Sequence, residues 1–91
     1  MTMILHTLNA SPSSPAFADC LGVVRSGDAV VLMGDGVYVA LAGTKAWGEA
    51  QARGAEIYLL VSDALAAGVT EFAGGATFID MDGFVALTER Y

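Results

Sequence analysis

The sequence has little of several residue types on which catalysis, metal binding and disulfide formation depend. Its 91 residues include one cysteine, one histidine and four basic side chains, while ten carboxylates bring the net charge to −6. A single cysteine cannot form an internal disulfide bond, which is typical of a protein in a reducing compartment. One cysteine and one histidine also fall short of the several convergent ligands that a metal site needs. We therefore expect no bound metal.

The shortage of basic residues and of long apolar runs excludes further classes of protein. Without a stripe of Lys and Arg, nothing neutralises phosphates, so we expect no direct binding to nucleic acid or to an anionic membrane surface. No stretch approaches the roughly 18–20 apolar residues that span a bilayer. The opening residues MTMILHTLNAS carry no positive charge before their apolar run, unlike a signal peptide. These features predict a cytoplasmic protein that is not associated with a membrane.

Apolar residues, by contrast, are abundant. They make up 55% of the chain, and the mean hydropathy is +0.58. We expect one domain over residues 1–91, and a chain of this length buries only roughly 60–65% of the surface that it exposes when unfolded. Apolar surface left outside a small domain usually marks a contact with a partner. The composition therefore predicts an oligomer, and it is compatible with self-association of the isolated chain.

Apolar runs and helical patterns alternate along the whole sequence. Strands are predicted at residues 3–8, 28–33, 56–61 and 76–79, and helices at 15–25, 37–41, 45–53, 62–68 and 80–91. Such alternation implies right-handed crossovers between parallel strands. The sequence thus predicts an α/β fold with a mainly parallel sheet of about four strands and helices on both faces.

Most of the familiar candidates for chemistry are better explained by structure. The Gly34-Asp35-Gly36 stretch lacks the third glycine of a dinucleotide fingerprint and is followed by no Walker lysine, so we interpret it as a turn and expect no bound cofactor. Asp80 or Asp82 is suited to cap a helix. His6 fits a hydrogen-bonded histidine at a strand end or interface, and Trp47 fits packing in the core or in an interface.

Cys20 is the remaining candidate. On a helical wheel of about 100° per residue, Phe17, Leu21 and Val24 form an apolar stripe and Cys20 lies on its flank. A flank position is compatible both with a buried thiol and with one at the mouth of a cleft. Asp19 is adjacent and negative, and this disfavours a thiolate. From spacing alone, an inert packed cysteine and a reactive one both remain open.

Four segments in series carry a resemblance to a known family. They are ILHTLNASP at residues 4–12, GDAVVLMGDGV at 27–37, YLLVSDALAAG at 58–68 and IDMDGFVALT at 79–88. In this order they resemble the DsrH/TusB family of sulfur-relay subunits, with Ala67 in place of the family's usual arginine. The spacing of Cys20 and Gly27 is similar to that of DsrH-type members, which carry a cysteine seven residues before this glycine, whereas many TusB-type members lack it.

The resemblance implies both a fold and a set of partners. The fold would be a small three-layer DsrE-like domain. The partners would be DsrE/TusD-like and DsrF/TusC-like subunits in a two-fold symmetric heterohexamer, with TusA and TusE or a DsrC-like protein as further sulfur carriers. Sulfur would pass as persulfide toward 2-thiolation of the tRNA wobble uridine, or in sulfur oxidation. The principal carrier would be a cysteine of the DsrE/TusD-like subunit, so that Cys20 would be an auxiliary one.

Three interpretations of function are open at this point. In the first, the chain is a relay subunit whose Cys20 carries persulfide sulfur, so that its enzymatic activity would be sulfur transfer. In the second, it is a purely structural subunit with a packed, inert Cys20. In the third, it is an unrelated module that forms homo-oligomers, and the four matching segments have no explanation.

Overall fold

The computed structural model describes residues 3–69 and 71–91, so Met1, Thr2 and Thr70 of the predicted 1–91 domain lie outside the description. The elements are, in chain order, β1 (Leu5–Leu8), α1 (Pro15–Val23), β2 (Ala29–Leu32), the 3₁₀ helix η1 (Gly34–Ala40), α2 (Lys45–Gln51), β3 (Glu56–Leu60), α3 (Val61–Ala66), β4 (Thr77–Ile79) and α4 (Met81–Arg90). Strands and helices alternate as the sequence predicts.

The four strands form one sheet in the order β1-β2-β3-β4, and each neighbouring pair is parallel. Leu8 pairs with Leu32 of β2, and Leu32 pairs in turn with Leu59 of β3. Since sequential strands are neighbours in the sheet, each connection is a helical crossover of the kind that parallel strands require. The predicted parallel sheet of about four strands is therefore confirmed.

Local sequence signals set the helix boundaries. Ser14 is the N-cap of α1 and its hydroxyl accepts a hydrogen bond from the Ala16 amide, with Pro15 in the first turn. Asp80 is the N-cap of α4 and accepts from the Gly83 amide at 2.8 Å. The predicted capping role is thus confirmed for Asp80. Most elements are a residue or two shorter than the sequence predicts, because the ends of strands and helices lose their pairing partners.

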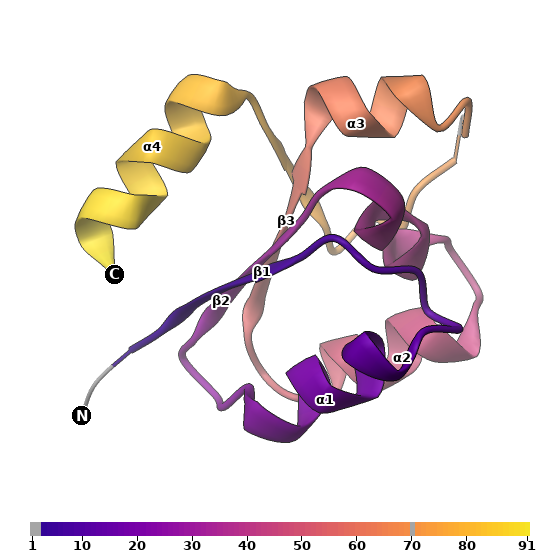
Figure 1. The fold of residues 1–91 in the computed structure, drawn as a ribbon, viewed down its shortest axis with the longest axis horizontal. Helices are drawn as coiled ribbons and strands as arrows, with labels where there is room; N and C mark the ends of the chain where they lie inside the picture. The colour runs from indigo at the N-terminus through magenta and orange to yellow at the C-terminus, as the bar shows by residue number, and fades with distance from the viewer. Residues whose placement is uncertain (1–2, 70) are drawn as a thin grey trace.

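One face of the sheet carries the main core. Leu8, Val30, Leu32, Ile57 and Leu59 point to this face by the alternation of the strands, and all belong to one buried cluster. The cluster continues through apolar residues of α1, α2 and η1, among them Phe17, Leu21, Trp47, Ala50, Val37 and Val39. Figure 1 shows α1 and α2 close together on this side of the sheet. The predicted packing of Trp47 is confirmed, since its side chain is buried in this core.

Helix α4 packs on the opposite face. Its Gly83 lies directly against the side chain of Ile79, and the helix inserts the buried Leu87. At its other end, Arg90 and Tyr91 come close enough to Tyr58 of β3 to act on it electrostatically. Ala29 and Val31 of β2 are fully buried on this face. The fold therefore has three layers, with helices on both faces of the sheet as predicted, and α4 stands apart from α1 and α2 (Figure 1).

The segment after β2 differs from the prediction in extent. The sequence predicts a short helix at residues 37–41, whereas η1 begins at Gly34 and ends at Ala40. The backbone of Gly36 presses against β1, so that a Cβ at this position would overlap the carbonyl oxygen of Leu8. Only glycine allows this approach. The second glycine of the Gly34-Asp35-Gly36 stretch thus serves packing at the carboxyl ends of the strands.

Candidate functional site

Cys20 lies on α1 at the margin of the main core. Phe17, Leu21 and Val24, the stripe predicted from the helical wheel, are all at most 8% exposed. Cys20 is half-buried and packs against the edge of the same cluster. The predicted flank position is confirmed. The thiol is therefore neither sealed in the interior nor fully presented to solvent.

The surroundings of Cys20 do not favour a thiolate. Burial raises the pKa of the Cys20 thiol above its ordinary value, and no charged group contributes to the shift. Helix α1 also has no basic residue in its last turn. A reactive cysteine normally has a cation or a helix N-terminus that stabilises its thiolate. In the isolated chain, Cys20 therefore has the character of a slow nucleophile.

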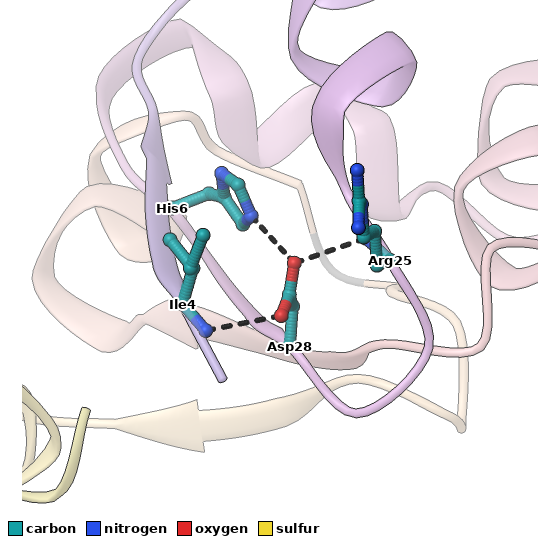
Figure 2. A network of polar contacts seen from close by, with 4 residues as sticks. All are labelled: Ile4, His6, Arg25 and Asp28. Atoms are coloured by element: carbon teal, nitrogen blue, oxygen red, sulfur yellow. Dashed lines mark hydrogen bonds and ion pairs between the residues drawn. The ribbon is translucent and has the colours of Figure 1, made fainter. Parts of the chain in front are cut away.

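His6, the single histidine of the chain, is held by a buried carboxylate. Its Nε2 lies 2.9 Å from Oδ2 of Asp28, and the two side chains are 12% and 3% exposed. Figure 2 shows that both point into the space between β1 and the loop that precedes β2. An ionised carboxylate can only accept hydrogen bonds, so Nε2 carries the proton. The interpretation of His6 as a hydrogen-bonded histidine at a strand end is confirmed.

Asp28 is the centre of a small polar network that sequence reasoning missed. Besides His6, it accepts hydrogen bonds from the Ile4 amide on Oδ1 and from the Arg25 amide on Oδ2, both at 3.0 Å (Figure 2). These bonds, led by the one from His6, lower the pKa of Asp28 to about 2. Asp28 stands at the start of a run predicted as a strand, and an acidic residue next to a fully apolar strand is a signal that could have pointed to it.

The network connects three parts of the chain. Ile4 precedes β1, Arg25 follows the helix that carries Cys20, and Asp28 precedes β2. Every donor is satisfied by one carboxylate, so the arrangement is well suited to fix the loop between α1 and β2. It has no open position for a substrate, and we interpret it as structural.

The Gly34-Asp35-Gly36 stretch, predicted as a turn, instead begins the 3₁₀ helix η1, and it lines a small hollow at the carboxyl end of the sheet. The hollow measures about 180 Å³ and is bordered by Asp35, Tyr38 and Asp63. The amide of Gly34 already donates to Oδ2 of Asp63 at 2.7 Å. A phosphate would need such amides free and would meet two carboxylates, so the stretch is poorly suited to bind phosphate. Within residues 3–69 and 71–91, no three or more His, Cys, Asp or Glu side chains are grouped as metal ligands would be.

Comparison with known proteins identifies the family. The sequence profile described as "DsrH like protein" matches residues 10–91. The chain belongs to the DsrH family. Its similarity to curated relatives extends over 89 residues, 97% of this chain and 94% of theirs: "Protein TusB" of Pectobacterium parmentieri is 40% identical, that of Pectobacterium carotovorum 37% and that of Escherichia coli K12 33%.

A solved structure shows the same fold. Protein Tm0979 from Thermotoga maritima, determined by NMR in solution, superposes with a TM-score of 0.71 and 24% identity, over 97% of this chain and 93% of that one. Membership of the DsrH family supports a role as subunit of a sulfur-relay complex, as the four matching segments predict. In the part of the DsrH-family chain that the structure describes, no helix has the length and apolar character needed to cross a membrane.

Proposed function

We propose that this chain is the DsrH/TusB-type subunit of a cytoplasmic sulfur-relay complex, in which it assembles with DsrE/TusD-like and DsrF/TusC-like subunits. The family match over residues 10–91 is the observation that carries the proposal. The excess of apolar surface supports it, because Leu65, Phe78 and Met81 are 49% to 77% exposed in the isolated chain. Large apolar side chains that are grouped on a surface usually mark a contact with a partner.

The process that we favour is 2-thiolation of the tRNA wobble uridine. The TusB-named relatives support it, at 33% to 40% identity over nearly the whole chain. The chain itself would not bind tRNA, because it carries only four basic residues; TusA- and TusE-like carriers would take the sulfur onward. Deletion of the gene is then expected to abolish the 2-thiouridine signal in tRNA nucleosides measured by mass spectrometry. Intact thiolation with impaired sulfur oxidation would place the chain in the other branch, with a DsrC-like partner.

For Cys20 we propose an auxiliary role as persulfide carrier in the assembled complex. Its thiolate would attack the outer sulfur of a donor persulfide, R–S–SH. The donor S–S bond would break, the donor would leave as its thiolate R–S⁻, and Cys20 would hold the sulfur as Cys–S–SH. An acceptor thiolate would remove that sulfur in the same way. Because burial raises the pKa of Cys20, a cationic group of a neighbouring subunit would have to stabilise the thiolate.

The second candidate, a structural subunit with an inert thiol, is favoured by the same rise in pKa. Alkylation distinguishes the two. In the isolated chain near neutral pH, we expect iodoacetamide to label Cys20 more slowly than free cysteine, because less of the thiol is ionised. In the complex with its DsrE- and DsrF-like subunits, the carrier role predicts faster labelling and a mass increase of one sulfur after incubation with a persulfide donor.

A control variant makes the measurement decisive. A Cys20→Ser variant should form the complex and show no labelling of this chain, because Cys20 is its single cysteine. If Cys20 in the complex reacts only after denaturation and gains no sulfur, the carrier role is wrong and the structural role stands.

A further inference from the structure

An apolar groove lies between α3 and the edge strand β4. It measures about 340 Å³, and its lining is entirely apolar: Val61, Ala64, Leu65, Val69, Phe72 and Phe78. The rings of Phe72 and Phe78 meet edge to face, with centroids 5.8 Å apart. Figure 1 shows α3 at the other end of the molecule from α1 and α2, while its buried Ala64 belongs to the same main core.

The groove remains exposed in the folded chain. Leu65 is 77% exposed, Phe78 49% and Val61 36%. β4 is also the last strand of the sheet, so one of its edges has no neighbouring strand from residues 3–69 or 71–91. Aromatic and aliphatic side chains grouped in a hollow are the usual centre of a protein–protein interface, where a partner's apolar side chains can be fully desolvated.

The charge of this region argues for a particular kind of occupant. The segment from Val61 to Asp82, which forms the groove, carries four carboxylates and no basic residue. Glu71 is exposed next to Phe72, and Asp80 and Asp82 are exposed just beyond β4. The sequence that forms and borders the groove therefore carries an excess of negative charge, with Glu71, Asp80 and Asp82 next to its aromatic residues and no Lys or Arg between residues 61 and 82.

A second copy of the chain is a poor match for this surface. A two-fold interface brings the same patch of each copy together, so Glu71 and the carboxylates beyond β4 would meet their own like charges. Like charges placed together across an interface oppose association. A different chain with an apolar ridge and a basic rim satisfies both the lining and the charge.

We propose that the α3–β4 groove is the docking site for a different subunit, whose apolar ridge is bordered by Lys or Arg side chains. This inference rests on the proposed function, since it assigns a surface to one of the partners of the relay complex. It makes the groove a heterotypic contact centred on Leu65 and Phe78, with Glu71 at its rim.

The test uses the full chain together with the DsrE/TusD-like and DsrF/TusC-like subunits of the same organism, purified and titrated by calorimetry. Leu65→Glu places a charge in the centre of the groove and should weaken binding at least about 10-fold. Val23→Glu is the matched control, because Val23 is 60% exposed on α1; it should change binding less than about 2-fold. Glu71→Lys should weaken binding by several-fold, and the wild-type affinity should fall as salt is added.

The outcomes separate the two proposals. If the wild-type chain does not bind these subunits, the proposed function is wrong and the inference falls with it. If the wild-type chain binds and Leu65→Glu binds equally well, the groove is not the docking site. The same conclusion follows if Leu65→Glu and Val23→Glu lose binding equally. A wild-type homodimer in light scattering that Leu65→Glu dissociates would make the occupant a second copy and overturn the heterotypic assignment, as would tighter binding by Glu71→Lys.

Discussion

Two regions of this small molecule differ in how much of their apolar surface the chain itself buries. On the α1–α2 side, apolar residues are buried in one cluster, and Asp28 satisfies two backbone amides and His6. Around α3, β4 and α4, large apolar residues stay exposed, although Ala64 of α3 reaches the main core. Of the eight large hydrophobic residues that are exposed within residues 3–69 and 71–91, five come from residues 61–85: Val61, Leu65, Phe78, Met81 and Val85.

The distribution of charge follows the same division. Residues 1–53 contain three of the four basic side chains and four of the ten carboxylates, whereas residues 54–91 contain one basic side chain and six carboxylates. Burial of apolar surface is the main source of stability, and like charges on an exposed surface weaken it. We infer that the α1–α2 side stabilises the fold and that the other side is available for contacts.

The largest expected effect comes from one substitution made on both sides. Phe17 of α1 is 5% exposed, and Phe78 of β4 is 49% exposed. Phe17→Ala removes a buried ring and should lower the free energy of unfolding by about 3–5 kcal/mol. Phe78→Ala loses only partial burial and the edge-to-face contact with Phe72, and should cost about 1 kcal/mol. Urea unfolding followed by circular dichroism measures both values; equal losses would contradict the division into two sides.

A second comparison measures how the stability of the Asp28 network changes with pH. The pKa of Asp28 is about 2 in the folded chain against an ordinary value of 3.8, so between these values the unfolded chain binds more protons. The contribution of Asp28 to the free energy of unfolding is therefore complete above about pH 4, and it is lost as the pH falls toward 2. Asp28→Asn should unfold at lower urea than wild type at pH 6, because its NH2 group replaces one of the two acceptor oxygens and faces either the Ile4 amide or the Arg25 amide, donor against donor.

This difference between Asp28→Asn and wild type should shrink as the pH is lowered from 4 to 2. Glu71→Gln, which neutralises an exposed carboxylate on the other side of the molecule, is the control and should show no such convergence. A gap between Asp28→Asn and wild type that stays constant from pH 6 to pH 3 would show that Asp28 does not titrate as the network implies.

The smallest expected effects concern the helix caps on the two sides. Ser14 caps α1 with a hydrogen bond of 3.3 Å, and Asp80 caps α4 with one of 2.8 Å. Asp80 also places a negative charge at a helix N-terminus. Asp80→Ala should therefore cost about 1 kcal/mol and Ser14→Ala about 0.5 kcal/mol. Thermal unfolding measures both, and a larger loss for Ser14→Ala would reverse the expected order.

Much of the fold follows from patterns that are local in the sequence. Strong apolar runs predict β2 and β3, and Ser14-Pro15 predicts the start of α1, because periodicity and capping depend on neighbouring residues. The flank position of Cys20 follows from the same helical periodicity. The exact ends of the strands and the length of η1 are less predictable, since they depend on contacts such as that between Gly36 and Leu8.

The Asp28 network and the α3–β4 groove were not predictable in this way. Asp28 meets His6 across 22 residues of sequence, and the groove joins Val61 to Phe78 across a loop. A single sequence has no signal for such pairs, because their meeting depends on the register of the strands and on the angle of the helices. The raised pKa of Cys20 likewise comes from packing, and spacing alone left its environment open.

The sequence by itself determined the α/β alternation, the parallel sheet, the capped helices and the position of Cys20 on its helix, because each depends on residues close together in the chain. Only the tertiary structure decided that His6 bonds to Asp28, that burial raises the pKa of Cys20, and that Val61, Leu65 and Phe78 line one exposed groove. These properties arise when distant segments share one environment, where burial and distance set the energies of charges and apolar surfaces.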